Sequence, residues 1–224
     1  SSAASDVYKR QLHAGIEMSE HLKAKGYHCP VAIHYDDLPE NVTVKELFGT
    51  MRKDDVIAHV FQTKAETIFD ENGKIKDCVW DAKKRGVYMD DCHGRVHWSY
   101  PNLQNAFSQS FYPDIISSDL VRVSEYTRPG FSLLYAMSVN SAAGMPTEKI
   151  LQSVTYTPAK SLGIEEKAGV IREGAPADVA ILDIRDVKDK TFTDNYGNSI
   201  SGNKLFVPLM TVKGGRTAYR QIFF

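Results

Sequence analysis

The sequence has few cysteines, almost no net charge and no long hydrophobic run. Its three cysteines show no CxxC spacing, so we expect no disulfide framework and a reducing, cytoplasmic location. The formal net charge of −1 gives no electrostatic basis for binding nucleic acid. No apolar run approaches the ~20 residues that span a bilayer, so we expect no membrane partner. Hydrophobic content of 42% and charged content of 25% are typical of a globular chain.

The first eleven residues, SSAASDVYKRQ, resemble the translation of a common sequencing-adapter oligonucleotide. A segment of that origin has no part in folding and is set aside, as an expression tag would be. We therefore expect residues 1–11 to be adapter-derived rather than native. We also expect the natural N-terminus to be missing, which makes the chain the C-terminal portion of a longer protein.

The next hundred residues or so alternate apolar runs with segments of helical pattern. The apolar runs predict buried strands at residues 30–34, 56–61, 87–90 and 113–119. The helical segments lie at residues 16–25, 41–50, 79–85 and 100–111. Near-continuous apolar strands that alternate with helices are typical of a parallel sheet covered by helices. The fold class predicted for this region is therefore α/β.

Polar side chains stand at the ends of the four predicted strands. They are His34, His59, Asp90 with the nearby His93, and Asp119, separated by about one strand–helix unit each. In a parallel barrel every strand delivers its C-terminal end to the same face, where active sites lie. The spacing therefore predicts that these side chains converge on one face.

The pattern changes in the second half of the chain. Helices are predicted at residues 132–143, 148–154 and 158–162, followed by a turn-rich strand region over residues 169–183. Turn sequences at residues 194–198 and 213–216 predict hairpins. We expect residues 165–224 to form a small β appendage.

Five motifs in order carry a resemblance to a known family. They are VAIH at residues 31–34, IAHVF at 57–61, CHG at 92–94, SSD at 117–119, and G-x4-G-x2-A-D-x4-D over 169–183. With them the chain resembles the amidohydrolase superfamily of metal-dependent barrel hydrolases, and within it the deacetylase group related to dihydroorotase. The resemblance implies a partial (β/α)8 TIM-type barrel, strands 5–8, over residues 12–164. It also implies a β-sandwich-like appendage over residues 165–224.

The resemblance further implies a zinc site of one or two divalent ions. His34 and His59 would be metal ligands, and Asp119 would both bind metal and act as the general base. Imidazole and carboxylate ligands suit Zn²⁺ but also accept manganese or iron. The reaction would be hydrolysis of a C–N bond in a small-molecule amide, with N-acyl deacetylation expected. An HxH pair and a lysine that normally complete such a site are absent from this chain.

Substrate contacts are predicted at His93, Gln62 and Lys64. The deacetylase group often has a second histidine three residues after the strand-6 ligand, where this chain has Gln62, so the choice of substrate stays open. The other histidines are interpreted as surface or packing residues: His13, His21, His28 and His97.

Two other interpretations stay open. The first is a dihydroorotase-like hydrolase of cyclic amides. The second is a non-catalytic short protein that pairs its open sheet edges with a partner chain. Homo-oligomerisation also remains open. Because the HxH pair and the lysine are absent, we expect the recorded chain itself to be catalytically inactive.

Overall fold

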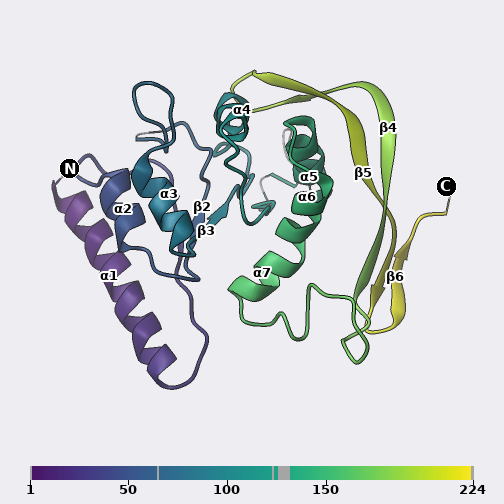
Figure 1. Ribbon diagram of the computed structural model, residues 1–224, viewed down its shortest axis with the longest axis horizontal. Coiled ribbons are helices and arrows are strands. Elements are labelled where there is room, and N and C mark those ends of the chain that lie inside the picture. The colour runs from purple at the N-terminus through teal and green to yellow at the C-terminus, as the bar shows by residue number, and fades with distance from the viewer. Residues whose placement is uncertain (1, 65, 123, 126–131, 223–224) are drawn as a thin grey trace. The chain divides into compact units, whose positions relative to one another are not determined.

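The computed structural model describes residues 2–64, 66–122, 124–125 and 132–222 (Figure 1). The chain forms two compact units. The first comprises residues 1–92 and 96–115, and the second comprises residues 93–95 and 116–224. The predicted boundary at residue 164 separates a barrel half from a β appendage, which is a different division from these two units, and it stays a prediction. Each unit is described by itself below.

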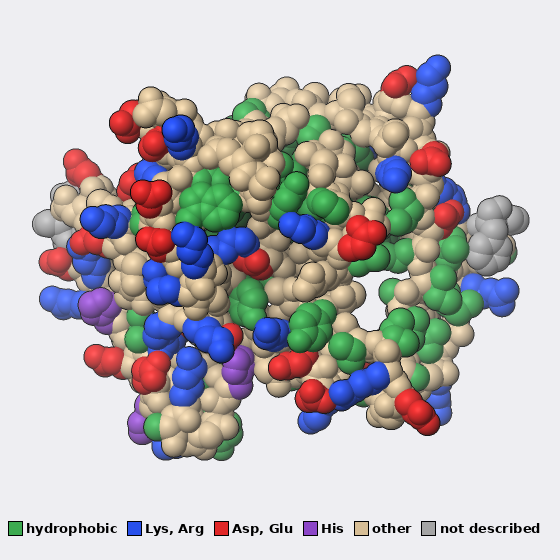
Figure 2. All heavy atoms as spheres, in the orientation of Figure 1, with side chains coloured by type: hydrophobic (Ala, Val, Ile, Leu, Met, Phe, Trp, Pro, Cys, Tyr) green, Lys and Arg blue, Asp and Glu red, His purple; other side chains and the backbone are tan. Residues whose placement is uncertain are grey.

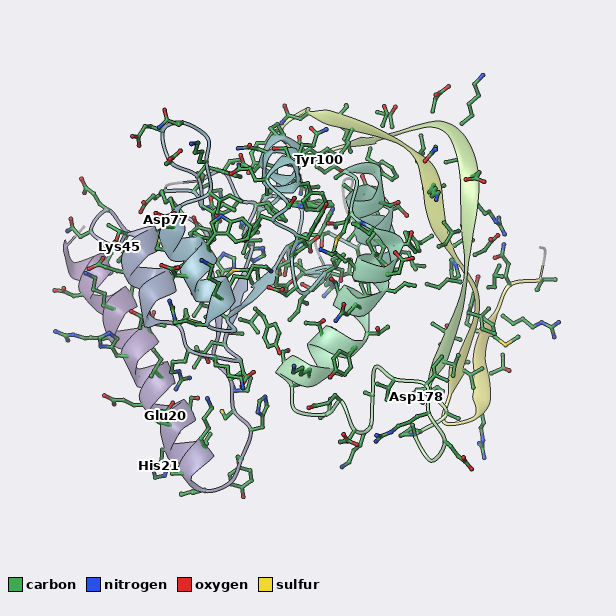
Figure 3. The ribbon with its side chains drawn as sticks, viewed as in Figure 1. Glu20, His21, Lys45, Asp77, Tyr100 and Asp178 are labelled. Carbon is green, nitrogen blue, oxygen red and sulfur yellow. The ribbon has the colours of Figure 1, made fainter. Side chains whose placement is uncertain are left out.

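The first unit begins with helix α1, Ser2–Ala24, which is longer than the helix predicted over residues 16–25. It therefore includes ten of the eleven adapter-like residues, while residue 1 lies outside the described part. Arg52 fixes the helix, because its guanidinium group pairs with Glu20 of α1 (labelled in Figure 3) and with the buried Asp55. The adapter origin of residues 1–11 stays a prediction.

A three-stranded parallel sheet forms the centre of the first unit, in the order β1-β2-β3. The middle residues of β2 and β3, Ile57 and Met89, are fully buried. A helix follows each strand, so the predicted alternation is confirmed here. The strands are β1 Ala32–His34, β2 Val56–Ala58 and β3 Tyr88–Asp90, and the helices are α2 Val44–Thr50, α3 Asp77–Lys84 and α4 Tyr100–Ser108.

The strand predicted over residues 113–119 is corrected to a single bridge. One parallel bridge joins Asp90 to Ile115, and the Asp114 and Ile115 N–H groups both donate to the Met89 carbonyl. Beyond this bridge the Asp91 N–H donates to the Ile115 carbonyl and the His93 N–H donates to the Ser117 carbonyl, so the two segments stay paired without forming a regular strand.

The second unit combines three helices with an antiparallel sheet. Both predicted hairpin turns are confirmed, and β4 and β5 form one long twisted ribbon with β6 paired to the far end of β5 (Figure 1). The strand predicted from residue 169 begins only at Val179. The elements are α5 Leu133–Ala142, α6 Thr147–Val154, α7 Tyr156–Ser161, β4 Val179–Thr193, β5 Ser199–Lys213 and β6 Arg216–Arg220.

The two ends of this ribbon differ in burial. Phe192 and Ile200 near the β4–β5 turn and Phe206 in the middle of β5 are buried, and the Phe206 N–H donates to the hydroxyl group of Ser138 on α5. At the other end every residue of β6 is exposed. Figure 2 shows Lys and Arg interspersed with Asp and Glu on the visible surface. None of the helices in the described part of the chain is long and apolar enough to cross a membrane.

Candidate metal centre

The register of the parallel sheet brings two histidines together. His34 is the last residue of β1 and pairs with Ala58, the last residue of β2. His59 follows Ala58 directly, so its ring lies beside that of His34, with the ring centroids 4.4 Å apart. The predicted convergence of polar residues at the strand ends therefore holds for this pair, and the reason is strand register.

His59 is held in a defined orientation. Its Nδ1 lies 2.7 Å from the Cys92 carbonyl oxygen, which accepts its hydrogen and leaves the Nε2 lone pair available. The side chain is almost fully buried, and this burial lowers its pKa to about 4, with the His34 and His97 rings adding to the effect. His59 is therefore neutral at pH 7, which is the form that binds metal.

The backbone at His59 is also unusual. Its φ angle is +67°, in the left-handed region that non-glycine residues seldom occupy. Such conformations cost about 1–3 kcal/mol and gather at functional sites. Asp37, Cys92 and Asp119, in the segments that follow the other predicted strands, also have positive φ. The chain turns sharply where each strand ends.

A third histidine, His97, belongs to the same group, although sequence reasoning took it for a surface or packing residue. Its ring centroid lies 4.5 Å from that of His59 and 4.9 Å from that of His34. The candidate ligand atoms of the three residues all lie within 4.8 Å of one another. The available signal was its place in the loop after β3, where polar residues of a parallel sheet gather.

Asp36 lies beside this group, with only 5% of its side chain exposed. Its Oδ2 is 2.7 Å from His97 Nδ1 and 3.9 Å from His34 Nε2. Lys64, one of the predicted substrate contacts, places its Nζ 3.0 Å from the same oxygen. The ammonium group therefore compensates the buried carboxylate.

Gln62, the second predicted substrate contact, is buried. Its side-chain Nε2 donates to the main-chain carbonyl of Glu66 at 3.2 Å. The main-chain carbonyl of Gln62 accepts from Asn102 Nδ2 at 2.7 Å. These bonds hold the loop after β2. The substrate roles of Gln62 and Lys64 stay predictions.

His93 and Asp119 belong to the second unit. The His93 N–H donates to the Ser117 carbonyl at 2.9 Å, and its ring lies 5.6 Å from that of Tyr135. Burial lowers the pKa of His93 to about 3. The role of His93 in substrate binding and the roles of Asp119 as ligand and general base stay predictions.

The donor set of the first unit fits a divalent transition metal. Imidazole nitrogens are ligands that Zn²⁺ and its neighbours accept, whereas Mg²⁺ and Ca²⁺ prefer oxygen. His59 adds a neutral ring whose other nitrogen is already hydrogen-bonded, the arrangement usual for a metal ligand. Of the predicted ligands, His34 and His59 can therefore hold such an ion.

Comparison with known proteins finds relatives that are named deacetylase or dihydroorotase. Proteins named deacetylase from Enterococcus faecalis and Brucella anthropi are 27% and 29% identical, over 90% and 89% of this chain. A dihydroorotase from Lactobacillus delbrueckii is 33% identical over 96 residues, 41% of this chain and 22% of the relative. The chain spans about half the length of the two deacetylases, 54% and 49%.

Solved structures of hydrolytic enzymes also match this chain. An adenine deaminase matches with a TM-score of 0.83 and 26% identity over 92% of this chain and 55% of its own. A dihydroorotase structure matches with a TM-score of 0.75 at 24% identity over 93% of this chain and 52% of its own, which supports the fold alone. The model of the amidohydrolase family matches residues 17–218. The predicted family is thereby confirmed, and the chain belongs to the amidohydrolase family.

Proposed function

We propose that this protein is a metal-dependent hydrolase of amide C–N bonds that acts as an N-acyl deacetylase. The observation that carries the proposal is the pair His34 and His59, which two neighbouring parallel strands present side by side. Membership of the amidohydrolase family and the relatives named deacetylase support the same chemistry.

In this proposal the fold is the strand 5–8 half of a (β/α)8 barrel over residues 12–164, with a β appendage over residues 165–224. His34 and His59 hold a zinc ion. When bound, such an ion supplies positive charge that polarises the amide carbonyl and lowers the pKa of water. The Asp119 carboxylate takes a proton from the attacking water and returns it to the leaving nitrogen, a role worth about 10²–10⁴ in rate. His93, Gln62 and Lys64 contact the substrate.

The experiment uses the longest natural reading frame that contains this sequence. N-acetylated amino and hydroxy acids are assayed before and after chelation, with zinc then added back. We expect turnover that chelation removes and zinc restores, and we expect Asp119→Asn to lower kcat by at least ~100-fold. Turnover that survives both chelation and the Asp119→Asn substitution would contradict the proposal. The 224-residue chain is assayed separately, and we expect no turnover from it.

Hydrolysis of a cyclic amide is the second candidate, favoured by the dihydroorotase from Lactobacillus delbrueckii. Both reactions cleave a C–N bond by the same chemistry, so the substrate alone separates them. The same assay therefore includes dihydroorotate and cyclic ureides, and adenine because of the adenine deaminase structure. Selective turnover of a ring substrate would replace the deacetylase assignment.

A further inference from the structure

Three imidazoles, not two, face one another at the C-terminal edge of the parallel sheet. The His97 ring makes a tilted contact with His59 and an edge contact with His34. His34 is the most exposed, with 59% of its side chain accessible, and 17% of the His97 side chain is accessible. The group is therefore buried on one side and open on the other, as a site that exchanges an ion with solvent must be.

Packing alone gives a poor account of this group. Imidazoles are polar, and a cluster of three would normally be satisfied by hydrogen bonds to one another or to the backbone. His97 Nδ1 is a buried atom without a hydrogen-bond partner among the described residues, although Asp36 Oδ2 lies 2.7 Å away. The Asp36 Oδ1 atom is likewise buried and without a hydrogen-bond partner there. Within the described residues Asp36 Oδ1 thus lacks the bond expected in a packed core, and His97 Nδ1 has the Asp36 carboxylate as its polar neighbour.

The charges around the group point to a cation. Asp36 supplies a carboxylate that is nearly buried. The ammonium group of Lys64, in the loop after β2, pairs with this carboxylate. A carboxylate that contacts the ring of a histidine ligand fixes that ring and raises its basicity, an arrangement common around bound metals. Asp36 stands at the right place for this role because its Oδ2 approaches the Nδ1 of His97.

We propose that His97 is a third imidazole ligand of the ion held by His34 and His59, and that Asp36 positions its ring. The proposal rests on the metal site of the proposed function and extends it to a residue from the loop after β3. Asp36 is a positioning residue, and Lys64 pairs with its Oδ2 at 3.0 Å. Three imidazoles favour Zn²⁺ or Co²⁺ over Mg²⁺.

The test measures binding of Zn²⁺ and Co²⁺ to the recorded chain by competition with a chelating dye and by the visible spectrum of bound Co²⁺. We expect His97→Ala to weaken Zn²⁺ binding by at least ~100-fold, and Asp36→Asn by roughly 10-fold. We also expect both variants to change the Co²⁺ spectrum. The matched control is His21→Ala, which removes an exposed histidine of α1 and should leave binding unchanged (Figure 3).

The outcomes separate this inference from the proposed function. If His34→Ala and His59→Ala abolish binding while His97→Ala stays within twofold of the parent, the third-ligand assignment is wrong and the two-histidine site stands. If the parent chain binds neither ion, the third-ligand inference fails, whereas the proposed function is decided by the turnover assay on the longer reading frame. Circular dichroism and the Tm of each variant in chelator identify loss of fold, and His97→Gln, which keeps a side chain of similar size, then replaces His97→Ala. A merely structural role for Asp36 would lower the Tm in chelator and leave the Co²⁺ spectrum unchanged.

Discussion

The two sheets of this chain reach stability in opposite ways. The parallel sheet of the first unit has strands of three residues, yet the middle residues of β2 and β3, Ile57 and Met89, are fully buried. The antiparallel ribbon of the second unit has two strands of 15 residues, of which only Phe192, Ile200 and Phe206 are buried. The first depends on packing and the second on its backbone ladder. The chemistry lies with the packed one, because packing holds side chains to a defined geometry.

The largest expected effect tests this contrast in the core. Ile57→Ala in β2 should lower the free energy of unfolding by about 2–5 kcal/mol, because it leaves a cavity at a fully buried site. Ile181→Ala in β4, where the side chain is 45% exposed, should change it by less than ~0.5 kcal/mol. Urea denaturation measures both. Equal losses would show that the ribbon is packed as tightly as the parallel sheet.

The second prediction concerns a tight contact between the ribbon and α5. A Cβ added at Gly202 would lie 2.6 Å from the Cβ of Ala142 on α5. Gly202→Ala should therefore destabilise the second unit by about 1–3 kcal/mol. Gly49→Ala in α2 is the matched control, because nothing lies within 4 Å of its added Cβ. There alanine should stabilise by about 0.5–1 kcal/mol, which thermal unfolding would detect. A Gly202→Ala protein as stable as the parent would show that α5 and β5 can separate freely.

The third prediction uses one buried histidine from each unit. Burial lowers the pKa of His59 to about 4 and that of His93 to about 3, below the ~6.5 of an unfolded imidazole. As the pH falls below about 6.5 the unfolded chain takes up protons that the folded sites exclude. The free energy of unfolding should then fall by about 1 kcal/mol per pH unit for each histidine, down to its folded pKa.

Urea denaturation at pH 7, 6 and 5 in the presence of chelator measures this slope. His93→Gln should remove its share of the pH dependence and leave that of His59. Stability that is the same at pH 5 as at pH 7 would contradict the burial of both rings.

The smallest expected effects lie at two helix starts. The Thr43 hydroxyl accepts from the Glu46 N–H, and the Glu46 side chain accepts from the Thr43 N–H, which forms a capping box at α2. Ser132 caps α5 through a single bond from the Tyr135 N–H. Thr43→Ala should cost about 1 kcal/mol, and Ser132→Ala somewhat less, because the Thr43 hydroxyl also donates to Glu46 Oε2 at 3.4 Å. Thermal unfolding measures both, with Thr43→Ser as the control that keeps the cap.

Much of the site could be predicted because it depends on strand ends. His34 and His59 each follow an apolar run directly, so their meeting required only that neighbouring strands be parallel. His97 lies seven residues beyond β3, and its position depends on the path of a loop that no periodicity reports. The position of Asp36 beside His97 could not be predicted either, because the contact joins the segments after two different strands.

In the fold, too, features set by local sequence could be predicted and features set by tertiary contacts could not. The hairpin turns follow from local turn sequences, so they could be read from the chain. The full length of β4 could not, because residues 186–190 are mostly charged and resemble a loop. In the structure a register shift between Asp186 and Lys190 lets the strand continue across them. The irregular pairing of residues 113–119 likewise depends on bonds to a distant segment, such as that from the His93 N–H to the Ser117 carbonyl.

The left-handed backbone at His59 has a consequence for protein engineering. Glycine adopts that conformation without steric penalty, so a search for variants that tolerate heat would favour replacing this imidazole. Such a selection would remove a ligand of the candidate metal centre while improving thermal tolerance. Libraries aimed at robustness should therefore keep position 59 fixed.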